Sequence, residues 1–419
     1  MLVDLTLSPE AGGHVKCWQR ISEAAVGFAD RLDLTVHFSG RRPERIDLSP
    51  SVRYALLPPV LSTARIVREV PDHTDLAPWH PRLARALADY DVIHTTDAFF
   101  CYARTATRFG RRHGIPIVTS IHTNTPEYAR ITAAQLLRRT LGEGLAYRAA
   151  NDLLALPDRI SAVLERRLAN HLSQVTSAMG SYGGEFDARY PACYQDRHCG
   201  VSLRRGLDRA TFNPARRDRG WFEARFGLPA GHCVLMYAGK LNAGKNVPVL
   251  APIVELVRNA GLPVHLFCAG DGPERSALET ALGPRLTCGG TLGQDELAAS
   301  YASADLFLFP SMIDESGNAA VEALACGLPA LLAAGSGVAS RMADCRGLRV
   351  LPGDRPELWA AAIAELVAAP AGLAEMAAAA HAYVEATVPS WADILAEDLL
   401  PVWQAAAAGT ASARGRHGE

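Results

Sequence analysis

Two carboxylates follow a short apolar run in the second half of the sequence and are the first candidates for chemistry. The run Leu306–Phe309 is closed by a proline and is typical of a buried strand, whereas Asp314 follows in a loop and Glu322 about one turn into a predicted helix. Carboxylates accept hydrogen bonds from hydroxyl groups, and the unpaired N–H groups at a helix start attract anions. The pair therefore predicts a site for a hydroxyl-rich ligand that carries a phosphate.

The residues between the two carboxylates carry the signals of a helix start. Ser316, Gly317 and Asn318 are cap-type residues, and a glycine and a proline further on mark the helix end. In the alternative interpretation, Asp314 only caps this helix and Glu322 is a solvated surface residue, and for an isolated loop that alternative would be favoured. Other parts of the chain shift the balance toward a ligand site.

Two lysines support an anionic ligand in the same half of the chain. Lys240 and Lys245 flank a glycine-bearing turn that follows the strand-like run Cys233–Ala238. Lysine ammonium groups and turn amides bind phosphate oxygens, so this turn predicts a cradle for a pyrophosphate. It is not a Walker loop, because the order Gly-Lys-Ser/Thr is absent.

Two further candidates lie in the first half. Gly12 and Gly13 stand between a strand-like run at 3–7 and a helical pattern, where the backbone can approach a ligand closely, although the full dinucleotide fingerprint is missing. His122 directly follows the strand-like run 115–121, at the edge where open α/β sheets bind ligands. A hydrogen-bonded loop histidine is an equally supported interpretation of His122.

Strands and helices alternate along the chain, which predicts parallel doubly wound sheets of the α/β class. The 419 residues are too many for one ordinary core and suit two domains. The predicted parts are an N-terminal domain at 1–214, a ligand-binding domain at 215–388, a final helix at 389–408 and a disordered tail at 409–419. Pro401 is expected to kink or break that final helix.

The amino-acid composition narrows the class of protein. Hydrophobic residues make up 49% and charged residues 21%, which is typical of a soluble enzyme and excludes a disordered chain. The nine cysteines are scattered singly, as expected of reduced thiols in a cytosolic protein. The start of the sequence has no basic segment typical of a secretory signal, and no apolar stretch is long enough for a membrane span. A cytoplasmic location is therefore expected.

Charge is shared unevenly between the halves. Residues 1–214 hold 27 Lys+Arg against 22 Asp+Glu, a balance of +5, and the remaining 15 and 22 give −7, which sums to the net −2. Arginines recur in two predicted helices at 129–150 and 158–172. These features predict peripheral contact with an anionic membrane or a phosphorylated acceptor, and the alternative is solvated helix faces that cover a core.

Several motifs occur in one order and together resemble family 4 retaining glycosyltransferases of the GT-B fold, in which two Rossmann-like doubly wound domains face a central cleft. The nearest branch contains sulfoquinovosyl- and phosphatidylinositol-mannosyl-type transferases. The resemblance covers most of the chain and is weak at 39–88 and 176–198. The motifs are Tyr237-Ala-Gly-Lys-Leu-Asn-Ala-Gly-Lys-Asn-Val247, Gly270-Asp-Gly-Pro-Glu-Arg275, Tyr301-Ala-Ser-Ala-Asp305, Phe309-Pro-Ser311, Glu322-Ala-Leu-Ala-Cys-Gly-Leu-Pro329, Ser120-Ile-His-Thr-Asn-Thr-Pro-Glu-Tyr128 and Arg204-Arg-Gly-Leu-Asp208.

The resemblance implies a hexosyltransferase that moves a sugar from a UDP- or GDP-sugar to an unidentified small-molecule or lipid acceptor. It implies that His122 lies near the transferred sugar, that Asp314 contacts sugar hydroxyls and that Glu322 binds the ribose. The remaining donor contacts that it implies are Gly12, Gly13, Arg205, Lys240, Lys245, Ser316, Gly317 and Asn318.

Some positions depart from the family pattern. Asp314 and Lys240 stand where glutamate and arginine are usual, and the lysine cannot bind phosphate in the bidentate manner of arginine. The resemblance implies a front-face mechanism in which the leaving diphosphate takes the acceptor proton, so catalysis rests on charge stabilisation and positioning. Because the lysines supply positive charge, we expect metal independence. We also expect no resident cofactor and no nucleic-acid partner.

Two other classes remain open at this stage. A GT-B epimerase or hydrolase would convert the nucleotide sugar without an acceptor. A non-catalytic scaffold with the same fold would require lost donor contacts, and the presence of Lys245, Glu322 and His122 argues against it.

Overall fold

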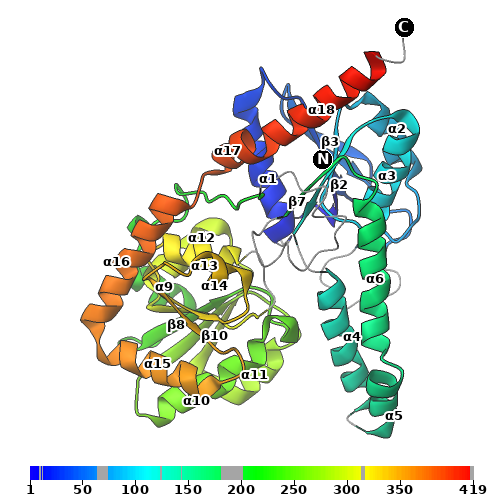
Figure 1. Cartoon of the computed structure of the whole chain (residues 1–419). Coiled ribbons are helices and arrows are strands. Elements are labelled where there is room, and N and C mark those ends of the chain that lie inside the picture. Colours follow the sequence, from blue (N-terminus) through cyan, green and yellow to red (C-terminus); the bar gives the residue numbers. More distant parts are fainter. Residues whose placement is uncertain are drawn as a thin grey trace. The chain divides into compact units, whose positions relative to one another are not determined.

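The computed structural model describes residues 1–8, 11, 13–63, 74–122, 125–142, 144–180, 202–312 and 317–415. The chain divides into two compact units (Figure 1). Unit 1 comprises Met1–Gly206 and Trp391–Glu419, and unit 2 comprises Leu207–Ser390. The first division therefore falls after Gly206, whereas the sequence predicted it after residue 214.

Unit 1 contains a seven-stranded sheet with the order β3-β4-β2-β1-β5-β6-β7. The strands pair in parallel except β3, which runs antiparallel to β4 at one edge. Their bounds are β1 Leu2–Thr6, β2 Leu34–Ser39, β3 Glu44–Ser49, β4 Val52–Leu57, β5 Ile93–Thr95, β6 Ile117–Ile121 and β7 Ser177–Gly180.

The first helix of unit 1 packs on this sheet through an apolar stripe. In α1, Val15, Trp18 and Ile21 are buried at helical spacing against the sheet, which fixes the start of this helix at the end of β1. The helices are α1 Gly13–Ala25, α2 Pro81–Ala86, α3 Cys101–His113, α4 Thr125–Leu141, α5 Leu145–Arg148, α6 Leu156–Leu172, α17 Trp391–Asp393 and α18 Leu400–Gly415, with 3-10 turns Val26–Phe28 and Leu87–Asp89 and a π-helical turn Ala149–Leu153.

The final helical segment differs from its prediction in two ways. The chain stays helical across Pro401, and the irregularity is a π-helical segment, Ile394–Leu399, just before it. Proline has no N–H to pair with the preceding turn, and a wider turn accommodates that loss. Residues 409–415 continue α18, so the predicted disordered tail is wrong over this range, and 416–419 lie outside the described residues.

Unit 2 contains a six-stranded sheet with the order β10-β9-β8-β11-β12-β13, and all its strands pair in parallel. The bounds are β8 Cys233–Ala238, β9 Val264–Ala269, β10 Leu286–Gly290, β11 Leu306–Phe309, β12 Ala330–Ala333 and β13 Leu348–Leu351. The helices are α9 Arg219–Phe226, α10 Leu250–Asn259, α11 Arg275–Leu282, α12 Gln294–Ser303, α13 Asn318–Ala325, α14 Gly337–Arg341, α15 Pro356–Ala368 and α16 Pro370–Thr387, with 3-10 turns Pro214–Arg216, Ala243–Lys245, Val247–Val249 and Gly283–Arg285.

Alternate residues of these strands build two separate cores, one on each face of the sheet. Met236 and Phe307 belong to one core, whereas their neighbours Leu235 and Leu308 belong to the other. The first core is covered by α9, α12, α13 and α16, and the second by α10, α11 and α15. Unit 2 is therefore doubly wound, as predicted.

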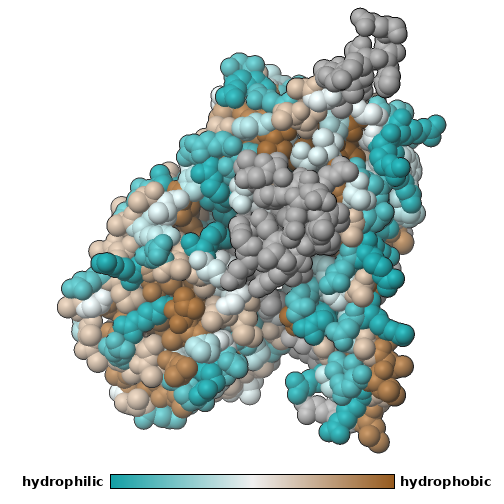
Figure 2. Space-filling model, in the orientation of Figure 1, coloured by the Kyte–Doolittle hydropathy of each residue, from teal (hydrophilic) through white to brown (hydrophobic). Residues whose placement is uncertain are grey.

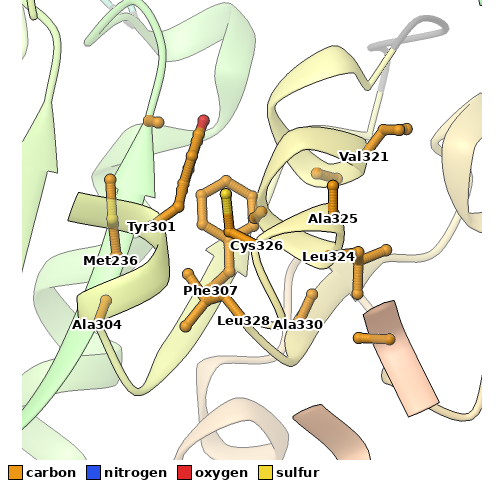
Figure 3. Close-up of a cluster of buried hydrophobic side chains, with 14 of the residues drawn as sticks. Met236, Tyr301, Ala304, Phe307, Val321, Leu324, Ala325, Cys326, Leu328 and Ala330 are labelled. Carbon is orange, nitrogen blue, oxygen red and sulfur yellow. The ribbon is translucent and has the colours of Figure 1, made fainter. Parts of the chain in front are cut away.

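The core under α13 holds this helix against the sheet (Figure 3). Leu324 on α13 is fully buried, and the ring of Phe307 on β11 meets Tyr301 edge to face at 5.6 Å between ring centroids. Burial of one leucine side chain contributes about 2 kcal/mol to stability. The position of α13 is thus fixed by its apolar face, independently of any ligand at its N-terminus.

No single helix in the described ranges has the length and apolar character needed to cross a membrane. The helices α15 and α16 meet such a test only when taken together, and they are bent by 103° where they join.

Candidate functional site

In unit 2 the sheet order reverses between β8 and β11, which are neighbours although two strands separate them in the sequence. Open α/β sheets bind ligands at such a switch point, outside the carboxyl ends of the two strands. The lysine turn follows β8 and the loop with the predicted carboxylate follows β11. The topology therefore brings the two strongest sequence motifs to one edge.

Asn246 joins these two loops. Its side-chain amide donates to the carbonyl of Pro310, 3.2 Å away at the end of β11, and to the carbonyl of Gly353, 2.7 Å away. Its backbone has φ 54°, in the left-handed region that asparagine tolerates better than most residues. The Asn242 side chain accepts from the backbone N–H of Lys245 at 2.9 Å and stabilises the same turn.

The turn after β9 lies directly on the lysine turn. A Cβ added to Gly270 would lie 2.0 Å from the carbonyl oxygen of Gly239, and one added to Gly272 would lie 2.3 Å from that of Leu241. Only glycine permits this backbone contact. The motif Gly270-Asp-Gly therefore has a structural role, because it packs against the backbone of the turn that carries the two half-buried lysines.

The helix α13 begins at Asn318, and Gly317 is its N-cap with φ 55° and no side-chain cap. The interpretation of Asp314 as the helix cap is not tested by this geometry. Asp314 and Ser316 lie outside the described residues. Glu322 is half-buried on α13, and burial together with this carboxylate raises the pKa of the Tyr301 hydroxyl.

In unit 1 the sheet order reverses between β1 and β5. Gly13 is the exposed first residue of α1, and the neighbouring His14 lies 3.1 Å from the hydroxyl of Thr96, measured from its Nε2. Gly12 lies outside the described residues. Residues from the ends of β1 and β5 thus meet at this edge.

His122 follows β6 at the same edge and is 6% exposed. Its Nε2 lies 2.7 Å from the hydroxyl of Ser120, and its Nδ1 accepts from the guanidinium of Arg205 at 3.0 Å. The rings of His14 and Trp18 pack edge to face on it, with centroids at 4.7 Å and 5.5 Å. Burial, with His14 and Arg205 nearby, holds the pKa of His122 well below its usual range, so the ring is neutral.

Arg205, predicted to contact the donor, lies inside unit 1. It is 8% exposed, and besides His122 it donates to Cys17 Sγ at 2.7 Å. The described geometry therefore makes it a partner of His122. Its predicted donor contact is not tested by this arrangement.

The structure thus gathers the predicted residues at two switch points. Unit 2 holds Lys240, Lys245, Gly317, Asn318 and Glu322, and unit 1 holds Gly13, His122 and Arg205. Sequence reasoning missed Asn246, Ser120 and the histidines at 14 and 94. The position of His14 directly after Gly13 was a usable signal, since a polar ring at a helix start beside a strand end lies at the ligand edge.

The part of the chain that the structure describes contains no group of three or more histidine, cysteine, aspartate or glutamate side chains placed to hold a metal ion.

Two doubly wound parallel-sheet units with sites at their switch points define the GT-B class. Sequence comparison agrees, because the model for Glycosyltransferase Family 4 matches residues 21–175 and the model for Glycosyl transferases group 1 matches residues 232–369. Anabaena HepE in complex with UDP and glucose shares the fold with a TM-score of 0.62, at 15% identity over 98% of each chain.

Similar sequences carry the names of sugar transferases. D-inositol 3-phosphate glycosyltransferase of Nocardiopsis dassonvillei is 28% identical over 417 residues, which covers 89% of both chains. GDP-mannose-dependent alpha-(1-6)-phosphatidylinositol dimannoside mannosyltransferase of Mycobacterium tuberculosis is 28% identical over 269 residues, or 64% of this chain and 63% of that one. The chain belongs to the family 4 glycosyltransferases of the GT-B fold and is a hexosyltransferase.

Proposed function

We propose that the protein transfers a hexose from a nucleoside diphosphate sugar, with retention of configuration and without a metal ion. The observation that carries this proposal is the Asn246 tether, which fixes the lysine turn next to the loop that leads into α13. The two lysines and the start of α13 follow the neighbouring strands β8 and β11, and cations together with helix-start amides are the chemistry that a diphosphate requires.

The residues take the following roles in the proposed reaction. Lys240 and Lys245 neutralise the diphosphate, and Glu322 accepts hydrogen bonds from the ribose. The bond between the anomeric carbon and the diphosphate oxygen breaks, and the acceptor oxygen bonds to the same face of that carbon. The acceptor proton passes to the departing diphosphate oxygen. Positioning and charge stabilisation supply the acceleration, and we assign His122 no covalent role because its two ring nitrogens are engaged by Ser120 and Arg205.

Names of similar proteins support the donor and acceptor classes. HepE is described in complex with UDP and glucose, and the Mycobacterium tuberculosis relative is GDP-mannose-dependent. The Nocardiopsis relative acts on inositol 3-phosphate, and the mycobacterial one on a phosphatidylinositol glycolipid. These acceptors share a polyol phosphate, so we propose an acceptor of that class, either free or lipid-linked.

A thermal-shift panel of UDP-, GDP- and ADP-sugars tests the donor site. A ligand that binds only the folded state raises Tm, and we expect a rise with one base. Lys245→Ala should abolish that rise and lower kcat/KM about 100-fold, which is the range for removal of one transition-state donor. Lys16→Ala on α1 is the matched control. Full transfer activity in Lys245→Ala would exclude the proposed donor site.

Further assays test the proposed retention of configuration and the proposed metal independence. NMR of the product anomeric proton tests retention, and activity in excess EDTA tests metal independence. Donor consumed equally well without any acceptor would instead indicate an epimerase or a hydrolase.

We also propose that unit 1 contacts an anionic membrane through the end of the α4–α6 hairpin. The two helices pack along each other, and α5 lies at their far end (Figure 1). There Leu145 and Leu153 are 84% and 82% exposed, and Figure 2 shows hydrophobic surface at the end of this hairpin. The exposed arginines Arg148 and Arg159 lie close in sequence to these leucines.

An anionic bilayer suits this end better than a second protein copy does. A stable protein interface uses about 20–30 residues on each side, more than the end of two helices offers. Leucines that enter the acyl boundary and arginines at the phosphates are the usual pattern of interfacial helices.

Vesicle flotation at low salt tests this contact. We expect binding to phosphatidylcholine vesicles that contain phosphatidylglycerol, and loss of binding in the double variant Leu145→Glu/Leu153→Glu. Leu256→Glu, on α10 of unit 2, is the control. Unchanged flotation of the double variant would contradict the proposal, and a change in its oligomeric state by light scattering would point to a second copy.

A further inference from the structure

A row of hydrogen bonds crosses unit 1 from its final helix to the predicted active-site histidine. The indole N–H of Trp403 on α18 donates to His94 Nδ1 at 2.8 Å, and His94 Nε2 lies 2.8 Å from Ser120 Oγ. Ser120 Oγ lies 2.7 Å from His122 Nε2, and Arg205 donates to His122 Nδ1 at 3.0 Å. We call these five residues the histidine bridge.

The two ends of the histidine bridge determine where its protons lie. An indole N–H and a guanidinium can only donate, so Nδ1 of both histidines must accept. Each neutral ring then carries its proton on Nε2, and both N–H groups point to Ser120 Oγ, whose two lone pairs can accept them. A proton added to Nδ1 of either ring would face another N–H. The geometry thus allows one tautomer and one charge state for both rings.

Packing keeps the rings in these positions. His94 is 2% and Ser120 0% exposed, and Trp403 is buried. The Trp18 ring lies edge to face on both histidines, with centroids 5.6 Å from His94 and 5.5 Å from His122. The indole of Trp18 thus packs against both rings.

We infer that Trp403 is a positioning residue for His122. The N–H of Trp403 sets the tautomer of His94, so that His94 Nε2–H donates to one lone pair of Ser120 Oγ. The other lone pair of Ser120 Oγ accepts from His122 Nε2–H. The inference rests on the proposed role of His122 near the transferred sugar. It goes beyond that role, because it makes α18 part of what prepares the site, although α18 follows the whole of unit 2 in the sequence.

The test combines activity with a direct view of the imidazole protons. In the full-length protein labelled with ¹⁵N-histidine, we expect NMR signals of two neutral rings protonated on Nε2. Trp403→Phe keeps a ring at the position and removes the N–H. We expect His94 to populate the Nδ1–H tautomer, the His122 signals to shift, and kcat to fall about 10-fold with the donor KM unchanged.

A double-mutant cycle shows whether the effect passes through Ser120. Ser120→Ala should lower kcat at least as far as Trp403→Phe does, Ser120→Thr should restore most of it, and the double variant Trp403→Phe/Ser120→Ala should be no slower than Ser120→Ala. Val402→Ala, buried on the same helix, controls for packing and should leave the His122 signals in place.

Two outcomes would overturn the inference: His122 signals that stay unchanged in Trp403→Phe, or rate losses that simply add in the double variant. The NMR result is independent of transfer. If the signals shift but His122→Ala keeps full activity, positioning by Trp403 stands and the proposed role of His122 fails.

Discussion

The two switch points share one topology and differ in chemistry. In unit 2 the edge between β8 and β11 consists of half-buried lysines on a backbone turn that is supported by other backbone. In unit 1 the edge between β1 and β5 leads into buried side chains around His122, where neutral imidazole rings lie beside the guanidinium of Arg205. A switch point can therefore provide partly exposed cations for an anion or a fixed arrangement of buried, hydrogen-bonded side chains.

This contrast predicts that acid affects unit 1 first and by the largest amount. Four histidines in unit 1 are less than a tenth exposed and have a pKa that burial lowers. For two of them the pKa falls to about 3 (His37) and about 4 (His171). Unit 2 has one such histidine, His265, with a pKa lowered to about 4. The other two in unit 1 are His94 and His122, whose pKa values burial also lowers well below the usual range.

The direction follows from proton binding. Unfolding lets each histidine take up a proton below its ordinary pKa of about 6.5, so its contribution to stability is complete above that pH and is lost as the pH falls toward the folded value. Each such group is worth about 2 kcal/mol between pH 6.5 and 5. Asp4 and Asp97 oppose this trend in part, since burial raises the pKa of both.

Limited proteolysis with mass spectrometry at pH 7 and pH 5 measures the difference. We expect new cleavage within unit 1 at pH 5 while unit 2 stays resistant. Equal or earlier cleavage in unit 2 would contradict the contrast.

The second prediction concerns the support of the cradle. Gly270→Ala would place a Cβ 2.0 Å from the carbonyl oxygen of Gly239, at φ 144°. We expect a loss of about 4 kcal/mol in the free energy of unfolding and loss of donor binding. Gly261→Ala also has a positive φ, 82°, but meets no atom within 4 Å, so it should lose about 1 kcal/mol and keep donor binding. Urea unfolding and donor titration compare the two variants.

The third prediction separates the tether from the turn that carries it. Asn246→Ala removes two hydrogen bonds and leaves a strained alanine in the left-handed region of backbone conformation. We expect the free energy of unfolding to fall by about 2 kcal/mol in all. Asn246→Gly removes the same hydrogen bonds without the strain. We expect a donor KM about 10-fold higher for the alanine variant and about 3-fold higher for the glycine variant. An unchanged KM in both would show that the tether does not position the lysines.

Several strands were predictable because residue types in the sequence mark where they end. Apolar runs closed by proline or glycine, such as Cys233–Ala238 and Leu306–Phe309, are the observed β8 and β11. The strand β3 went unassigned because it is solvent-facing and polar along most of its length, so it carries no apolar run. The strand β4 went unassigned although every second residue is buried. The strand β7 also went unassigned, inside a stretch rich in glycine, tyrosine and aspartate.

The site was only partly predictable. The lysine turn and Glu322 were predicted from local motifs, because each follows its own strand, β8 or β11, in a recognisable pattern. Trp403 and His94 are 309 residues apart, and no periodicity or motif relates them. The burial of Arg205 was hidden for the same reason, since its partners Cys17 and His122 are far away in the sequence.

The chain leaves unit 1 at Gly206 and returns at Trp391, whose indole packs directly against that glycine. Unit 2 is thus one uninterrupted segment, and a ribosome delivers all of it before α18 emerges. All strands of unit 1 are synthesised before unit 2, whereas α18 of unit 1 is synthesised after it. During synthesis, the lysine turn of unit 2 can be complete while His94 still lacks its hydrogen bond from the indole of Trp403.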